Sequence, residues 1–136
     1  MEDKIFKIIE ENSEHFFDLD VDEYKSKINM LNESGTTFPY LYCVQLNSTI
    51  LTFFLDLYEE YIDINNANKE GYTVLMEYAS QDDIHAVQKL LRAGVDWTMK
   101  DKEGMTAIDY ANFEERGLEG GMETHYELMK WAETHS

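Results

Sequence analysis

The stretch that decides the fold is residues 68–75, NKEGYTVL, which returns 33 positions later as residues 101–108, DKEGMTAI. Working backwards along the chain, residues 32–37, NESGTT, match the same pattern 36 positions earlier. A period of this length predicts a row of similar, stacked units in place of a globule with one unique core. The first interval is three residues longer than the second, and these extra residues are expected to lengthen one helix.

The residue types of each stretch predict a turn followed by a helix. The first residue, Asn68 or Asp101, can form an Asx turn, and the glycine three positions later can adopt the positive φ that such a turn needs. The threonine two positions after that glycine, Thr73 or Thr106, can accept a hydrogen bond from a free amide of the next helix. Each stretch therefore predicts the start of a helix just after its threonine.

A second helix is predicted over residues 84–92, because apolar residues recur there at helical spacing. Its apolar stripe consists of Ile84, Val87, Leu90 and Leu91. Gly94 is expected to end this helix in the left-handed conformation. The matching stripe of the preceding unit consists of Ile50, Leu51, Phe54, Leu55 and Tyr58.

This unit resembles the ankyrin repeat, which has a 33-residue period of one β-turn and two helices. The resemblance extends from about residue 28 to the carboxyl end. It implies an all-α ankyrin-repeat solenoid of stacked helix-turn-helix units, with β-turn tips and irregular terminal caps. We expect a single domain over residues 1–136, with an amino-terminal cap in 1–31 and repeats in 32–67, 68–100 and 101–136.

The opening motif departs from the family's Thr-Pro-Leu-His-x-Ala pattern. Val74 and Met76 stand where the family has proline and histidine, and Pro39 is displaced by one position in the first repeat. The chain is therefore expected to be a divergent member.

The amino-terminal cap lacks the turn motif. Apolar residues behind Asp3 predict a short amphipathic helix that this aspartate caps, namely Ile5, Phe6, Ile8 and Ile9. A second helix is expected to include Phe16, Phe17 and Leu19.

The last repeat contains an insertion, residues 114–121, between helices expected at residues 106–113 and 125–133. The second of these helices has Leu128, Trp131 and Ala132 in the stripe positions. Three glycines in the insertion predict a mobile loop. Two interpretations stay open: a surface loop without a role, or an arm that touches a ligand or partner.

The charge of the chain restricts its partners. The 136 residues include 28 Asp and Glu against 11 Lys and Arg, which gives a net charge of −17. Such a field repels phosphate backbones and anionic lipid head groups, so we expect no direct binding of nucleic acid or membranes. It favours a basic protein partner, although acidity also serves solubility alone.

Cys43 is the single cysteine, so the fold cannot contain an internal disulfide. This suits a reducing compartment and predicts a cytoplasmic protein, in agreement with an amino terminus that has no apolar leader segment. Because Cys43 matches the small residue Ala79 of the next repeat, we expect it to be a buried apolar group and not a nucleophile.

No catalytic or metal-binding motif emerges from the sequence. The alternating carboxylates of residues 18–22 resemble the start of a calcium loop but lack its glycine and its distal glutamate. The four histidines show no metal-ligand spacing. We therefore expect no enzyme activity, no metal and no cofactor.

The resemblance implies that turn tips and first helices form a concave binding face. Carried over position by position, the candidate partner-binding residues are Glu33, Thr36, Leu41, Lys69, Glu70, Tyr72, Glu77, Lys102, Glu103, Met105 and Tyr110. Tyr72, Met105 and Tyr110 would form an apolar and aromatic centre, surrounded by acidic residues.

Size, acidity and this fold also resemble the single-domain immunity proteins of bacterial toxin systems, some of which are ankyrin-like and bind basic, nucleic-acid-cleaving toxins. The sequence thus predicts a non-catalytic inhibitor of the immunity or antitoxin type, a monomer or weak dimer when free, that binds a basic, nuclease-like toxin. Two alternatives stay open. One is a general scaffold, adaptor or effector that binds a cellular protein, and the other is an acidic mimic of nucleic acid.

Overall fold

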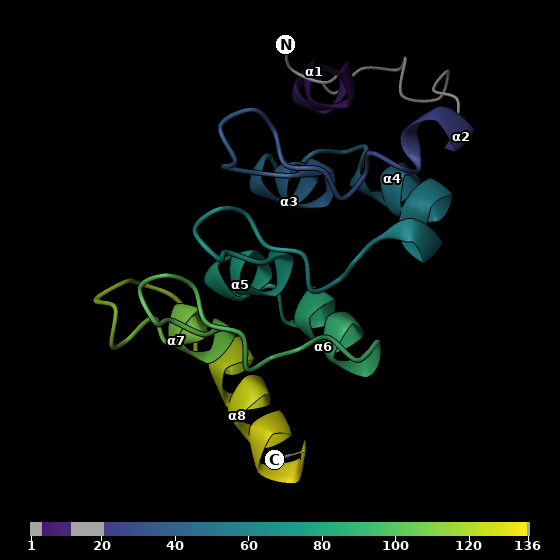
Figure 1. The fold of residues 1–136 in the computed structure, drawn as a ribbon. Helices are drawn as coiled ribbons and strands as arrows, with labels where there is room; N and C mark the ends of the chain where they lie inside the picture. The colour runs from purple at the N-terminus through teal and green to yellow at the C-terminus, as the bar shows by residue number, and fades with distance from the viewer. Residues whose placement is uncertain (1–3, 12–20, 136) are drawn as a thin grey trace. The chain divides into compact units, whose positions relative to one another are not determined.

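The computed structural model describes residues 4–11 and 21–135. Its elements in chain order are α1 (Lys4–Glu11), α2 (Val21–Tyr24), α3 (Pro39–Gln45), α4 (Leu51–Tyr58), the 3₁₀ helix η2 (Glu59–Tyr61), α5 (Val74–Ser80), α6 (Ile84–Arg92), α7 (Ala107–Ala111) and α8 (Glu123–His135) (Figure 1). The described ranges contain helices and turns without a β-strand, which confirms the all-α class. Three sequence features lie outside these ranges: the expected cap at Asp3, the helix expected around Phe16 and most of the carboxylate run in residues 18–22.

The chain divides into two compact units, residues 1–69 and residues 70–136. Each unit has a core of its own, built from short helices and the turns between them.

In residues 1–69, α3 packs against both α1 and α4. All four apolar residues predicted for the first helix are buried on α1, Ile5 among them. On α4 the aromatic side chains of Phe54 and Tyr58 are fully buried, with ring centroids 5.5 Å apart. Phe54 also faces the ring of Tyr40 on α3, at 6.3 Å. The predicted stripe of this repeat therefore forms the core, although Leu51 and Leu55 are only half-buried.

The start of α3 differs from the starts of α5 and α7. Proline has no backbone N–H to lose and its φ suits a first helical position, so α3 begins at Pro39. Its N-cap residue is Phe38, which offers no side-chain hydrogen bond. Thr37, which the repeat pattern equates with the capping Thr73, instead donates its hydroxyl to Oε1 of Gln45 at 2.9 Å.

This later start corrects one predicted binding residue. Each residue advances a helix by roughly 100°, so moving the start by one position rotates the following side chains by that angle. Leu41 thereby takes the third helical position, which in α5 belongs to the buried Met76, and is 0% exposed. The expectation that Leu41 contacts a partner is wrong. Tyr42, half-buried, stands at the fourth position, which Glu77 has in α5 and Tyr110 in α7.

In residues 70–136, α5 packs against α6 and α7, and α8 packs against α6 and α7. The predicted helix over residues 84–92 is confirmed as α6, whose amino end is capped by the Asp83 carboxylate accepting from the Ala86 amide at 3.1 Å. Val87, Leu90 and Leu91 are buried and Ile84 is half-buried. Gly94, with φ +89°, follows the last turn as predicted.

The insertion, residues 114–121, lies between α7 and α8, and specific contacts define its path. The Leu118 amide donates to the Phe113 carbonyl at 2.8 Å. Gly120 lies so close to the Phe113 ring that a Cβ at this position would meet the ring at 2.5 Å. The Asp82 carboxylate accepts from the Thr124 amide at 3.3 Å, which ties the start of α8 to the turn before α6.

The helices on either side of the insertion differ in length from the prediction. Helix α7 ends at Ala111 instead of Phe113, and α8 extends from Glu123 to His135 instead of residues 125–133. Leu128 of the predicted stripe is buried, whereas Trp131 and Ala132 are half-buried.

Candidate functional site

The tip before α7 is held by the side chain of Asp101. Its Oδ1 accepts hydrogen bonds from the backbone amides of Glu103 at 2.9 Å and Met105 at 3.0 Å. Gly104 has φ +79° and donates its amide to the Asp101 carbonyl at 2.9 Å. The Asx turn predicted at Asp101 is confirmed. It leaves the side chains of Glu103 and Met105 on the surface of the tip.

Both predicted threonine caps are present. Thr73 Oγ1 accepts from the Met76 amide at 3.2 Å at the start of α5. Thr106 and Asp109 form a capping box at the start of α7, in which each side chain accepts from the other residue's amide. Gly71 has φ +79° in the tip before α5. These caps set where α5 and α7 begin, and so which side chains each helix presents beside its tip.

Two tyrosines meet on the surface that the tips before α5 and α7 form with the starts of these helices. Tyr72, from the tip before α5, and Tyr110, on α7, have ring centroids 5.2 Å apart and ring planes at 87°, the edge-to-face geometry that aromatic pairs favour. The Tyr72 hydroxyl donates to Oε2 of Glu77 at 2.7 Å. The Tyr110 hydroxyl donates to Oδ2 of Asp101. Both rings are half-buried, and hydrogen bonds at the hydroxyl ends fix their orientation.

The hydrogen bonds also set the charge state of the pair. Burial raises the pKa of Tyr72 well above its usual value, and the Glu77 carboxylate adds to this. Burial and the bond to Asp101 do the same for the pKa of Tyr110. Burial alone would raise the pKa of Asp101, but the Tyr110 hydroxyl and two backbone amides lower it further, so the pKa lies below its usual value. At neutral pH the phenols are therefore protonated donors and Asp101 is a carboxylate.

One side chain of the insertion belongs to the same surface. The Arg116 guanidinium lies over the Tyr110 ring, 5.2 Å from its centroid, and Nη1 donates to the Tyr110 carbonyl at 2.9 Å. Beside it is a surface pocket of about 360 Å³ lined by Met105, Asp109, Glu115 and Arg116. Sequence reasoning did not single out Arg116. A usable signal was that it is the one basic residue of the insertion, next to two glutamates.

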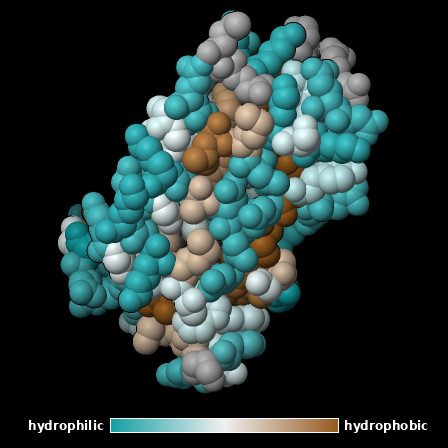
Figure 2. Space-filling view, in the orientation of Figure 1, coloured by the Kyte–Doolittle hydropathy of each residue, from teal (hydrophilic) through white to brown (hydrophobic). Residues whose placement is uncertain are grey.

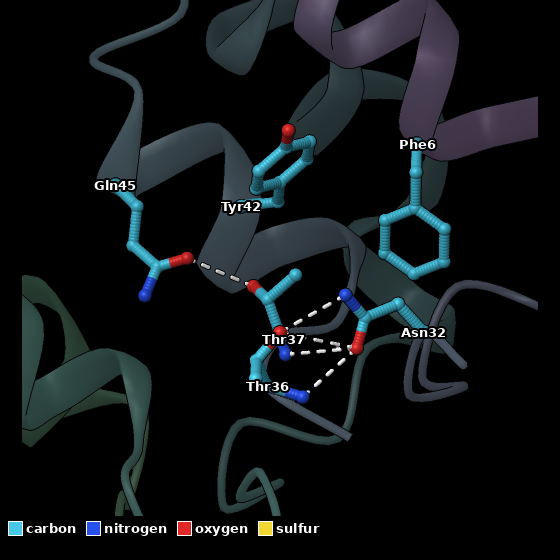
Figure 3. A pocket seen from close by; sticks show the side chains of 6 residues that line it. All are labelled: Phe6, Asn32, Thr36, Thr37, Tyr42 and Gln45. Carbon is cyan, nitrogen blue, oxygen red and sulfur yellow. Dashed lines mark hydrogen bonds between the residues drawn. The ribbon is translucent and has the colours of Figure 1, made fainter. Parts of the chain in front are cut away.

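The first unit has a pocket of about 330 Å³ beside its own tip, lined by Phe6, Asn32, Thr36, Thr37, Tyr42 and Gln45 (Figure 3). The rings of Phe6 on α1 and Tyr42 on α3 lie 6.0 Å apart. Asn32 Oδ1 accepts from the amides of Thr36 at 2.9 Å and Thr37 at 3.3 Å, as the dashed lines in Figure 3 show. The polar groups of this pocket thus bond largely to one another.

The predicted site residues fall in both units. In residues 1–69, Glu33, Thr36 and Lys69 are exposed and Leu41 is buried; in residues 70–136, Glu70, Lys102 and Glu103 are exposed and Tyr72, Glu77, Met105 and Tyr110 are half-buried. The structure brings Tyr72, Tyr110 and Glu77 into direct contact. It adds Arg116 and Asp101, which the prediction omitted, and it replaces Leu41 by Tyr42.

Two other kinds of site, a reactive cysteine and a metal site, find little support in the described residues. Cys43 is fully buried, and burial raises the pKa of its thiol to about 12, so little thiolate forms at neutral pH. In the described ranges no three His, Cys, Asp or Glu side chains gather as a metal site would require. The helices of these ranges are all too short or too polar to span a membrane. Hydrophilic side chains cover most of the face seen in Figure 2.

Comparison with known proteins identifies the repeats. Residues 57–111 match the family described as ankyrin repeats (many copies). The crystal structure of the ankyrin repeat domain of Bcl-3, described as a unique member of the IkappaB protein family, superposes with a TM-score of 0.67 at 13% identity, over 93% of this chain and 50% of that one. Residues 57–111 therefore carry ankyrin repeats, and the chain has the ankyrin-repeat fold.

A segment of this ankyrin-repeat chain is also similar to the Arabidopsis thaliana protein named LHCP TRANSLOCATION DEFECT, with 48% identity over 42 residues. The match covers 31% of the chain and 24% of the plant protein. The chain thus spans half or less of the length of these similar proteins. Ankyrin repeats indicate a module for protein–protein interaction, which is the function class that the sequence predicted.

Proposed function

We propose that this ankyrin-repeat chain binds a basic protein through the tips and first helices of residues 70–136, with Tyr72 and Tyr110 at the centre of the contact. The observation that carries the proposal is the tyrosine pair itself, two half-buried rings in edge-to-face contact whose hydroxyls are anchored to carboxylates. Rigid aromatic side chains lose little entropy on binding and contribute much of the energy of interfaces.

Charge supports a basic partner. Glu70 and Glu103 are exposed at the two tips, and Asp101 is ionised beside Tyr110. Together with the net charge of −17, these groups would raise the rate of association with a cationic surface. The apolar faces of the two rings would then slow dissociation, because most affinity differences between related complexes reside in the dissociation rate.

More specifically, we propose that the basic partner is a toxin and that this chain inhibits it. A small, acidic ankyrin-repeat chain resembles immunity proteins that cover the site of a basic, nuclease-like toxin. We propose that this chain acts in that way, without catalysis of its own. A nucleic-acid mimic is less well supported, because the site carboxylates of Asp101 and Glu77 are bonded to protein groups and do not form an open row.

The experiment is a capture and titration series. The purified chain is presented to cationic nuclease domains and to the other proteins of its host, basic and acidic, and each captured protein is titrated by calorimetry. Tyr72→Ala with Tyr110→Ala should abolish binding while circular dichroism stays unchanged. Tyr72→Phe with Tyr110→Phe should retain most of the affinity, because the ring faces remain. Tyr126→Ala is the matched control, since this ring is 64% exposed on α8 and lies at neither tip.

The outcomes separate the alternatives. Unchanged affinity of the double alanine variant would remove the tyrosine pair from the interface. Capture of an acidic protein would contradict the role of charge. Capture of a basic protein without nuclease activity would replace the toxin inhibitor by an adaptor, and a complete loss of affinity at moderate salt would favour the nucleic-acid mimic.

A further inference from the structure

We propose that the Tyr110 ring face now covered by the chain's own Arg116, together with the adjoining pocket that Arg116 lines, accepts an arginine side chain of the partner. This inference rests on the proposed function for the identity of the partner as a basic protein. The pocket itself can be tested without any partner.

Arg116, one wall of the pocket, shows what kind of group the neighbouring Tyr110 ring accommodates. Its planar guanidinium lies over the Tyr110 ring at 5.2 Å and donates from Nη1 to the carbonyl of the same residue at 2.9 Å. A guanidinium suits such a place because it stacks on aromatic faces and carries several donors in one plane, whereas an ammonium is a compact point charge. The ring and carbonyl thus form a receptor for a guanidinium within the chain.

The other walls of the pocket suit the rest of an arginine. Met105 offers an apolar surface for the methylene stem, and Asp109 and Glu115 supply carboxylates for the head group. Asp109 Oδ2 is engaged by Thr106, and Glu115 Oε2 accepts from Asn112. In the described part of the chain no ion pair joins Arg116 to either carboxylate. Both acids are therefore available to a second cation.

The position of Arg116 allows its side chain to move away from the Tyr110 ring. It is exposed, and it belongs to the insertion, where the following Gly117 has φ +69° and no neighbouring atom within 4 Å of the place of a Cβ. A partner arginine would compete with Arg116 for the Tyr110 face. Arg116 thus competes within the chain for the same ring face. Its removal should strengthen the binding of an arginine from another molecule.

The test uses short peptides and the full chain. Acetyl-Gly-Arg-Gly-amide is titrated against the protein while the ring resonances of Tyr110 are followed by NMR, with lysine and norleucine peptides as comparisons. Arg116→Ala should tighten binding of the arginine peptide by about two- to fivefold. Arg92→Ala is the matched control, because it removes the same charge from an exposed position on α6 and should leave the affinity unchanged. Glu115→Gln should weaken binding.

Three results would overturn the inference: no shift of the Tyr110 resonances in Arg116→Ala, equal binding of the norleucine or lysine peptide, or equal effects of Arg92→Ala and Arg116→Ala. A failure here would leave the binding of a basic protein by the tyrosine pair intact, since that is measured with a whole partner. A failure of the double tyrosine variant would instead contradict the proposed function and leave the peptide result unaffected.

Discussion

The tips at residues 32–37 and 101–106 share a turn closed by a glycine and present different surfaces. In the first, the Asn32 amide donates to the Thr37 carbonyl at 2.9 Å and the Gly35 amide donates to the Asn32 carbonyl at 3.0 Å. In the second, the Gly104 amide makes the equivalent bond to the Asp101 carbonyl, but the Asp101 amide donates to the Met105 carbonyl, four positions ahead instead of five, both at 2.9 Å. The shared bond teaches that a leading Asx residue and a glycine three positions later are enough to specify this turn.

The difference lies in what surrounds each turn. The side chains of Asn32, Thr36 and Gln45 are neutral, and they bond within the first tip. Around the second tip stand the two tyrosines and the cation of Arg116. The same glycine turn therefore supports a tip whose polar side chains bond to one another in one unit and a candidate binding surface in the other.

The largest expected effect tests the corrected register of α3. Leu41→Ala and Met76→Ala remove fully buried side chains at the same helical position in the two units, so each should lower the free energy of unfolding by about 2–5 kcal/mol. Chemical denaturation of both variants measures this. A cost for Leu41→Ala within about 0.5 kcal/mol, the value typical of a surface position, would restore Leu41 to the exposed face.

A smaller difference is expected between two glycines of positive φ. Gly35→Ala and Gly71→Ala both force an L-residue into the left-handed region, at about 1–2 kcal/mol each. A Cβ on Gly71 would also lie 3.0 Å from the Asp101 Cα, which is backbone, whereas on Gly35 it would meet the flexible Lys69 side chain at 3.1 Å. Thermal unfolding should therefore rank Gly71→Ala as the more destabilising variant. The reverse order would contradict the close approach of the two tips in residues 70–136.

The smallest effect concerns pH. The folded state lowers the pKa of Asp101 below its usual 3.8, so this carboxylate contributes stability that is present above pH 3.8 and is lost as the pH falls through the folded value. The tip at residues 32–37 uses the neutral Asn32 in the same role. Asp101→Asn should accordingly make unfolding less sensitive to acid as the pH falls below 3.8. An acid dependence identical to that of the unmodified chain, followed by urea titration at each pH, would contradict the contribution of Asp101.

The prediction from sequence was most accurate where structure depends on neighbours along the chain. The turn at Asp101 and the caps at Thr73 and Thr106 follow from residues at most four positions apart, and the bounds of α6 follow from the spacing within one short segment. It was wrong at α3, where the repeat pattern implied a start after Thr37 but Pro39 moved it by one residue. The preference of proline for the first helical position was the signal that would have corrected it.

What the sequence determined by itself is the class of the molecule: an all-α row of ankyrin repeats whose tips and helix starts obey local rules. The ankyrin resemblance placed Tyr72 and Tyr110 in one centre, whereas tertiary structure alone decided the geometry of their contact and added Arg116 to it. Tyr72 touches Tyr110 because α5 packs on α7, and Arg116 covers Tyr110 because the insertion folds back onto that helix. Turns and caps are short-range and can be inferred from spacing, but contacts between residues 38 positions apart depend on packing that no local pattern specifies.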